Sequence, residues 1–473
     1  MSGRWCVGRL ERLVLALGLF LAPAMEALPA RAAGIEVDTF QLNNGMQVVV
    51  IPDHRAPVVT HMVWYKIGSA DEPVGLSGVA HFLEHLMFKR TKNLEDGEFS
   101  KIVAENGGQH NAFTSYDVTA YYQSVAKDRL PLMMKIEADR MANLNLKPAD
   151  IAAERDVIIE ERRLRIENNP SALLGEQMMA ALYLAHPYGT PVIGWKAEME
   201  ALSYDAVMDF YAKHYTPSSA ILIVAGDVTA DEVRALAEKT YGRHKGREVE
   251  PRQRRAEPAP IAARRLELVD SRVRQPSWDR IYLAPSYNRG AKEHAPALAV
   301  LAQIMGGGAT SRLYRRLVVD EQTAVDAGAY YSGSYYDLGQ FGIYAVPPPE
   351  FETEAARERM VAVEASVERV LADLLNEGVT EAELERAKRR LLASEIYARD
   401  NLMSMAQIFG RALTAGLTIE DVLAWPDKIS AVTVADVQAA ARTVLRPEGS
   451  VTGLLLPKPA EPAPAAPVEG GQP

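Results

Sequence analysis

Two histidines and a glutamate stand together in the segment His81-Phe82-Leu83-Glu84-His85. On an α-helix, positions i and i+4 are neighbours, so His81 and His85 can present ring nitrogens to one metal ion while Glu84 stands beside them. Two imidazoles suit Zn²⁺, and a catalytic zinc ion keeps three protein ligands and one open position for a water whose pKa falls to about 7. The spacing therefore predicts a zinc site with Glu84 as the general base.

The residues around this segment predict a buried helix. Gly75 and Gly78 precede it, Ser77 is a suitable N-cap, and apolar residues fill most positions as far as Phe88. One alternative is a core helix whose two histidines make ordinary hydrogen bonds. The chain has nine histidines among 473 residues. A chance match to the motif is then expected in only about one protein in a hundred, which favours the metal site.

A third ligand must come from elsewhere, and the best acidic candidates lie in a helical segment that begins near Glu154. Val157 and Ile158 lie at i−4 and i−3 from Glu161, and Leu164 lies at i+3. Glu161 therefore projects from the apolar face, while Glu160 is turned by about 100° towards solvent. Glu154 falls on the same face as Glu161 and is placed to hold a ligand or tune the bound water. The alternative for Glu154 and Glu160 is a solvated helix surface on which they pair with neighbouring arginines.

Together these motifs resemble the pitrilysin or M16 metallopeptidases, and more closely the smaller bacterial members related to the mitochondrial processing peptidase β subunit. The order His-x-x-Glu-His is that of the inverzincins, and 75 residues separate His85 from Glu161. Further stretches that carry the resemblance are Asn111–Ser115, Thr119–Tyr122, His186–Gly189, Pro217, Gly226–Asp227, Gly306–Gly308 and Ser311–Leu313.

The resemblance assigns roles to the residues of the motif. It implies that His81, His85 and Glu161 are the ligands of one zinc ion per chain, that Glu84 is the catalytic base, and that Glu154 is an auxiliary catalytic acid. A metal-activated water would then attack the peptide bond.

The resemblance also implies a mode of substrate binding and a fold. The strand around Asn111 and Ala112 is similar to the edge strand on which family members pair an extended substrate. The implied fold is α+β, with two homologous domains that each pack helices on an antiparallel or mixed sheet, as in the LuxS/MPP-like metallohydrolase fold.

A repeated pattern in the chain independently indicates a duplication. Ser203 opens a predicted helix that ends near Pro217 and precedes an apolar strand, and 230 residues later Thr433 and Pro447 repeat this pattern. Helical patterns recur in both halves, which predicts an α+β fold rather than regular βαβ units. The strand-like runs are residues 47–51, 58–65, 120–125 and 340–346.

The N-terminus is typical of an export signal. Arg4, Arg9 and Arg12 flank the start of an apolar run over residues 13–22, and small residues near position 33 suit a signal peptidase. The run is shorter than the roughly 20 residues that span a bilayer. We therefore expect a cleaved signal peptide over residues 1–33, a periplasmic mature protein and no membrane span in the mature form.

Composition bounds the remaining organisation. We expect an N-terminal peptidase domain over residues 34–245, a charged, proline-rich linker over 246–263, a homologous domain without a metal site over 264–456, and a disordered tail over 457–473. Loss of the signal moves the net charge from −10 to about −12, which disfavours nucleic-acid binding. The single cysteine, Cys6, lies in the signal, so thiolate metal ligation and a cysteine nucleophile are excluded.

The second half departs from the resembled family. In members of that family, the C-terminal domain often supplies an arginine and a tyrosine, seven residues apart, that bind substrate and stabilise the oxyanion. Alignment on Ser311–Leu313 places Val318 and Val325 there, and neither side chain can donate a hydrogen bond. Tyr330 or Tyr331 is the substitute if the alignment shifts. The resemblance then implies a heterodimer in which a metal-free homologue supplies the pair, with a homodimer as the alternative.

The sequence thus predicts a zinc-dependent endopeptidase that acts on extended peptides or unfolded protein segments. The first alternative is a non-proteolytic assembly or binding subunit that retains the fold, and the intact metal motif argues against it. The second alternative is metal storage or sensing, in which a base beside the metal would have no purpose.

Overall fold

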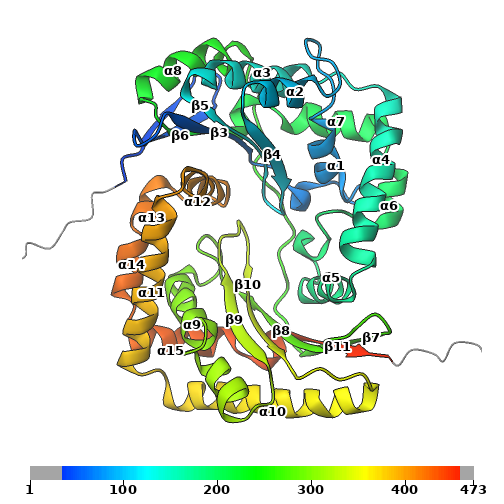
Figure 1. The fold of residues 1–473 in the computed structure, drawn as a ribbon, viewed down its shortest axis with the longest axis vertical. Helices are drawn as coiled ribbons and strands as arrows, with labels where there is room; N and C mark the ends of the chain where they lie inside the picture. The colour runs from blue at the N-terminus through cyan, green and yellow to red at the C-terminus, as the bar shows by residue number, and fades with distance from the viewer. Residues whose placement is uncertain (1–34, 459–473) are drawn as a thin grey trace, which may run out of the picture. The chain divides into compact units, whose positions relative to one another are not determined.

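The computed structural model describes residues 35–458, which fold around two β-sheets covered by helices (Figure 1). The expected signal peptide, residues 1–33, lies outside this range, as do residues 459–473 of the expected tail. Pro457, the first residue of that expected tail, instead ends the last strand of the second sheet. Within residues 35–458, no helix combines the length and the apolar character needed to cross a membrane.

The first sheet has six strands, and β4 lies at one of its edges. The strand order is β1-β2-β6-β3-β5-β4, with bounds β1 (Asp38–Gln41), β2 (Gln47–Pro52), β3 (Val58–Tyr65), β4 (Gln109–Thr114), β5 (Thr119–Ala126) and β6 (Ala220–Gly226). The helices that share its core are α1 (Val79–Leu86), α2 (Glu98–Glu105), α3 (Leu130–Asn143), α4 (Pro148–Arg162), α6 (Lys196–Ala201), α7 (Tyr204–His214) and α8 (Ala230–Lys239).

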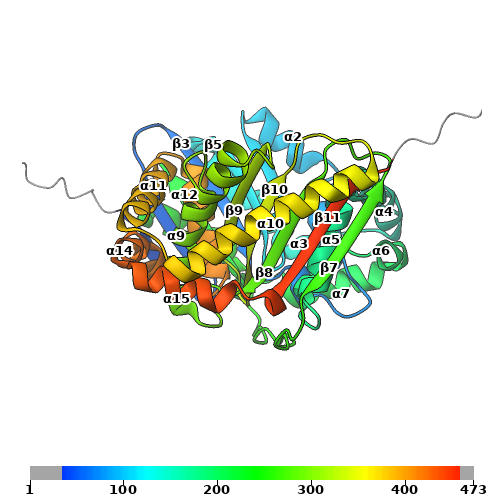
Figure 2. The ribbon, with the colours of Figure 1, turned by 90° about the horizontal axis from the view of Figure 1, so that it is seen from below.

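The second sheet has five strands in the order β7-β11-β8-β10-β9. Its strands are β7 (Arg264–Asp270), β8 (Ser277–Ala284), β9 (Asp326–Ser332), β10 (Gly339–Val346) and β11 (Ser450–Pro457). The helices in its core are α9 (Ala295–Gly306), α10 (Thr353–Glu377), α11 (Glu381–Arg399), α14 (Trp425–Ala431) and α15 (Val434–Val444). The long helix α10 lies across β8 and β11 (Figure 2).

The two sheets repeat one topology, which confirms the α+β fold with two related halves. Strand β6 lies between parallel β2 and antiparallel β3, and β11 lies in the same way between parallel β7 and antiparallel β8. The helix before each of these strands is capped as predicted, because the Ser203 hydroxyl accepts the N–H of Ala206 and the Thr433 hydroxyl accepts the N–H of Asp436.

Each half also lends a helix to the sheet of the other half. Helix α5 (Pro170–Leu182) packs on β7 and β11, whereas α12 (Leu402–Thr414), which precedes α13 (Ile419–Leu423), packs on β3 and β6 (Figure 1). Both contacts are close. A Cβ atom at Gly453 would lie 2.2 Å from Sδ of Met178, and one at Gly410 would lie 2.1 Å from Cε2 of Trp64. Larger residues at these two glycines would force the helix away from the sheet.

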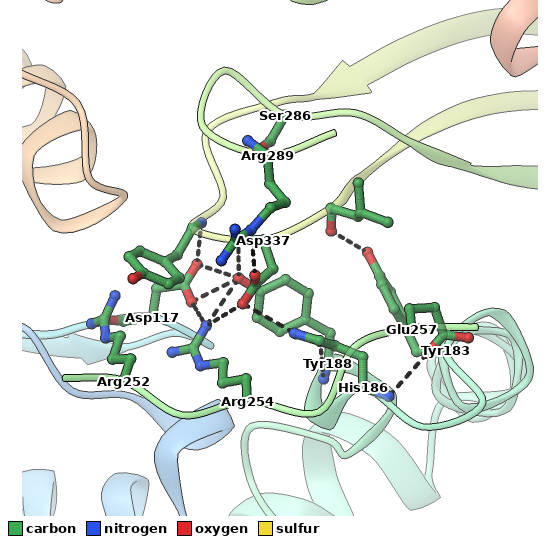
Figure 3. A network of polar contacts seen from close by, with 12 residues as sticks. Asp117, Tyr183, His186, Tyr188, Arg252, Arg254, Glu257, Ser286, Arg289 and Asp337 are labelled. Atoms are coloured by element: carbon green, nitrogen blue, oxygen red, sulfur yellow. Dashed lines mark hydrogen bonds and ion pairs between the residues drawn. The ribbon is translucent and has the colours of Figure 1, made fainter. Parts of the chain in front are cut away.

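The segment between the halves, residues 246–263, contains no helix or strand. Its residue Arg254 nevertheless holds it against both halves through ion pairs. The Arg254 side chain is only 3% exposed, with Nη2 2.8 Å from Asp71 and Nη1 3.4 Å from Asp337. The same guanidinium contacts Asp117 (Figure 3). Asp71 and Asp117 belong to the first half and Asp337 to the second, so one arginine ties three segments together. The domain boundaries that we predict stay predictions.

Candidate metal centre

Helix α1 presents the histidine motif, but it begins differently from our expectation. Ser77 is not the N-cap, because that place is taken by Gly78 in the left-handed conformation (φ 89°). The Ser77 hydroxyl instead accepts an N–H from a neighbouring loop. The carboxylate of Glu72 accepts the N–H groups of Gly78 and Ala80 at 2.9 and 2.8 Å. These contacts satisfy two N–H groups at the end of the helix, where N–H groups lack partners within the helix.

The structure brings His81, His85 and Glu161 together. One ligand atom from each residue lies within 4.8 Å of the other two. Glu161 Oε2 is 3.3 Å from Nε2 of His85 and 3.8 Å from Nε2 of His81. This oxygen is buried without a hydrogen-bond partner. Two imidazoles and an orphaned carboxylate oxygen form a donor set that fits a zinc ion with an open fourth position.

Helix α4 directs Glu161 inward, in part as the sequence pattern predicts, because Ile158 at i−3 is buried in the core. The Glu161 side chain is 15% exposed, whereas Glu160 is 49% exposed and pairs with Arg163. However, Val157 and Leu164 are 51% and 60% exposed. They line a cavity instead of the core. The predicted apolar face is thus divided between the core, which takes Ile158, and the cavity wall, which includes Val157. Helix α4 also packs against α1, which carries the two histidines.

Glu154 contacts the edge of the His85 ring that faces away from Glu161. Its Oε1 is 3.0 Å from Nδ1 of His85, and its Oε2 is 2.9 Å from Nζ of Lys89. With Nδ1–H donating to this carboxylate, Nε2 of His85 is left free to bind a metal. Glu154 does not line the cavity. Its position therefore suits holding a ligand rather than touching a substrate.

The charges of the cluster suit a cation. Burial lowers the pKa of His81 to about 4, with a further contribution from His85. Burial also opposes the protonation of His85, but its hydrogen bond to Glu154 and its close contact with the Glu161 carboxylate outweigh burial and raise its pKa to about 9. The contacts with His85 lower the pKa of both carboxyl groups. Both glutamates are therefore ionised at neutral pH.

Glu84 lies beside this cluster and reaches the same cavity. Burial raises its pKa, and a hydrogen bond from Thr114 opposes the rise. The Thr114 hydroxyl lies 2.5 Å from Oε2 of Glu84. Our sequence reasoning gave Thr114 no role. The sequence does contain a signal for placing Thr114 at the site. Thr114 lies two residues beyond Ala112, a predicted substrate contact, and residues at this spacing point to the same face of a strand.

The cavity has a volume of about 960 Å³ and is lined by residues between His81 and Ile193. Both Asn111 and Ala112 line it, on the edge strand β4. Arg165 is the one lysine or arginine among the described residues that line it, and its Nη1 is 2.7 Å from Oε1 of Glu161. The cavity wall is thus built entirely from the first half.

The residues that we considered in the second half lie away from this wall. Val318 packs against the core of the second half, and Val325 is half exposed. The Tyr331 hydroxyl donates to the carbonyl of Pro285 at 2.6 Å, and Tyr330 is partly exposed on β9. Within the described residues, these four side chains contribute nothing to the cavity lining.

Comparison with known proteins identifies the family. Residues 47–196 match the family model described as insulinase (peptidase family M16), and residues 201–391 match the one described as peptidase M16 inactive domain. The zinc protease PqqE of Helicobacter pylori is 31% identical over 425 residues, which cover 89% of this chain and 93% of that protein. The uncharacterized zinc protease ML0855 of Mycobacterium leprae is 32% identical over 439 residues, with coverages of 89% and 91%.

A solved structure agrees with these matches. The crystal structure of a protease from Helicobacter pylori superposes with a TM-score of 0.80 and 30% identity, over 89% of this chain and all of that one. The chain therefore belongs to peptidase family M16, which confirms the resemblance seen in its motifs. The names of the relatives support a protease role in general and associate it with zinc.

Proposed function

We propose that this chain is a zinc-dependent endopeptidase that hydrolyses extended peptides or unfolded protein segments. The observation that carries the proposal is the cluster of His81, His85 and Glu161 with Glu84 beside it. The cluster opens onto a cavity that is also lined by β4, the edge strand of the first sheet. A metal donor set, a base and a place for an extended chain thus meet in one site.

In this proposal His81, His85 and Glu161 hold the metal, and Glu154 orients His85. When bound, zinc would polarise the scissile carbonyl and make a water more acidic. Glu84 takes a proton from the attacking water and passes it to the nitrogen of the leaving amine. The C–N bond breaks, a C–O bond forms, and one water is consumed.

The edge strand β4 supports the choice of substrate. It pairs with β5 on one side, and its other side is free within the described residues. A peptide can add there as a further strand, with Asn111 and Ala112 as its contacts. Only an extended segment can pair in this way, which favours short peptides and unfolded regions over folded proteins.

A second candidate function is a non-proteolytic assembly or binding subunit. It is favoured by the match of residues 201–391 to a domain described as inactive, and by a cavity wall that the second half does not share. The metal cluster in the first half weighs against it.

We further propose a periplasmic location and a heterodimeric partner. The basic and apolar pattern of residues 1–33 supports export. Valines at positions 318 and 325 support a metal-free M16 homologue as the source of the arginine and tyrosine pair, with a homodimer as the alternative.

The proposal is tested by metal analysis and peptide hydrolysis on the full chain, alone and with the homologue. We expect one zinc per chain and cleavage of an internally quenched peptide. Glu84→Gln should keep the zinc and lower hydrolysis by a factor of about 10² or more, because the base is lost and the ligands remain. A zinc-loaded chain that never cleaves, even with the homologue, would identify a binding subunit. Parental rates in Glu84→Gln would exclude Glu84 as the base.

A further inference from the structure

Thr114 has one hydroxyl hydrogen, and the structure directs it to Glu84. The Thr114 oxygen is 2.5 Å from Glu84 Oε2 and 3.4 Å from the hydroxyl of Thr119. Thr119 donates its own hydrogen to the carbonyl of Ile67 at 3.1 Å. A threonine can donate only once, so the shorter contact with the carboxylate takes the Thr114 hydrogen.

This contact makes the two carboxylate oxygens of Glu84 unequal. Oε2 accepts the Thr114 hydrogen, whereas Oε1 receives no hydrogen bond from Thr114. The terminal torsion of a glutamate is broad and roughly two-fold, so a carboxylate without a partner samples several orientations. One hydrogen bond from a strand residue is enough to select a single plane for the group.

The register of β4 places the backbone of Thr114 on the free edge of the sheet. The N–H of Ser115 donates to the carbonyl of Val118 across the turn. Hydrogen-bonded pairs alternate along an antiparallel ladder, so the backbone groups of Thr114 and Ala112 point away from β5. In agreement, the N–H of Ala112 donates to the side chain of Asn111 at 2.9 Å instead of to β5. An added peptide strand would pair with these outward groups.

We infer that Thr114 is a positioning residue that links the docking of a peptide on β4 to the orientation of Glu84. Its backbone faces the place of the peptide, and its side chain holds the base. A peptide that pairs with β4 fixes the strand, and the strand fixes the carboxylate plane. The inference rests on the proposed role of Glu84 as the base.

The test compares Thr114→Val with Thr114→Ser. Valine keeps the shape and the β-branched character that suit a strand but has no hydroxyl, whereas serine keeps the hydroxyl. We expect Thr114→Val to lower kcat by roughly 10-fold or more and to change KM by less than about 3-fold, because only the orientation of the base is lost. Thr114→Ser should recover kcat to within about 3-fold of the parent. Zinc content and thermal stability should be unchanged in both.

Combination with Glu84→Gln separates positioning from a general effect on structure. Thr114→Val should slow the parent but cause no further loss in the Glu84→Gln background, since there is no base to orient. Peptide affinity, measured without turnover in that background, should be the same with threonine or valine. A kcat for Thr114→Val equal to that of the parent, or a serine variant as slow as the valine variant, would overturn the inference.

A readout that needs no activity keeps the two proposals apart. A parent that cleaves no peptide would defeat the proposed function, but crystal structures of the zinc-bound parent and Thr114→Val still report on the positioning. We expect the Glu84 carboxylate to rotate when the hydroxyl is removed. An unchanged carboxylate in the valine variant would overturn the role of Thr114, whatever the activity.

Discussion

Nδ1 of His85 lies 3.0 Å from Oε1 of Glu154, and this contact turns Nε2 of the same ring towards Oε2 of Glu161 at 3.3 Å. Partners of this kind fix the orientation of a metal-binding histidine, and their loss typically weakens metal binding by about 10- to 100-fold. We expect Glu154→Ala to raise the zinc dissociation constant within this range. The matched control is Glu160→Ala on the exposed side of α4. Equal affinities of the two variants would contradict the role of Glu154.

Zinc content should identify the ligands. Replacement of His81 or His85 by alanine removes one of three donors, so we expect the purified protein to contain no zinc. Glu161→Gln should weaken zinc binding strongly, because an ionised ligand is lost. Glu160→Gln should bind like the parent, since Glu160 pairs with Arg163 instead. Metal analysis after dialysis measures this, and a similar loss from both glutamine variants would show that our ligand assignment is wrong.

Zinc affinity should increase with pH. The pKa of His85 is raised to about 9, so without metal this ring is protonated at neutral pH. Zinc binds the neutral ring and must displace that proton. His81, with a pKa of about 4, carries no proton to displace. We therefore expect the zinc affinity to rise by about tenfold per pH unit from pH 6 to 8 and to level off above pH 9. Competition with a chromogenic chelator, corrected for its own protonation, measures this, and a flat profile would exclude a protonated His85.

Local patterns predicted much of the fold. The expected strands at 47–51, 58–65 and 340–346 correspond to β2, β3 and β10, because alternation and turn residues are local signals. The mutual packing of α5 and α12 on the opposite sheets was not predicted, because no local pattern records which distant surface a helix covers. The sequence revealed the duplication of the two halves only where N-cap residues and prolines recur at the same spacing, as in Ser203 with Pro217 and Thr433 with Pro447.

The candidate site was predictable where spacing on one helix decides geometry. His81 and His85 follow from the helical repeat, and Glu161 follows from an apolar face that lies partly in the core and partly on a cavity wall. Periodicity shows that a face is apolar, but it does not show whether protein or solvent covers it. The contact of Thr114 with Glu84 joins residues 30 positions apart and depends on how β4 crosses α1. Such a contact needs the tertiary structure.

Arg254 should be important for stability. Its side chain is almost fully buried among Asp71, Asp117 and Asp337. Arg254→Met would leave these carboxylates without their shared cation, and removal of one partner from a buried ion network typically costs about 3–5 kcal/mol. Urea denaturation measures the free energy of unfolding. The exposed neighbour Arg255 provides the control, because Arg255→Met should change it by no more than about 0.5 kcal/mol. Equal stabilities would show that the network does not hold the halves together.

The second half of this chain has valines where the resembled family has hydrogen-bond donors for the oxyanion. Val318 and Val325 lie outside the cavity lining and cannot donate, and loss of such a donor typically costs about 10²–10³ in rate. We therefore expect slow peptide hydrolysis by the isolated chain at a defined oligomeric state, and a gain of about this size when a metal-free homologue is co-expressed. The homologue alone is the control.

Full activity of the isolated chain, unchanged by the homologue, would remove the case for two subunits and point to a donor within this chain. Tyr330 and Tyr331 are less suitable than the sequence suggested, because neither lines the cavity and the Tyr331 hydroxyl is engaged by Pro285. Arg165 does line the cavity, and its contact with Glu161 uses Nη1. Arg165→Gln should then lower kcat in the isolated chain, whereas Tyr330→Phe should not. If the homologue is required, neither substitution should reduce the gain that it provides.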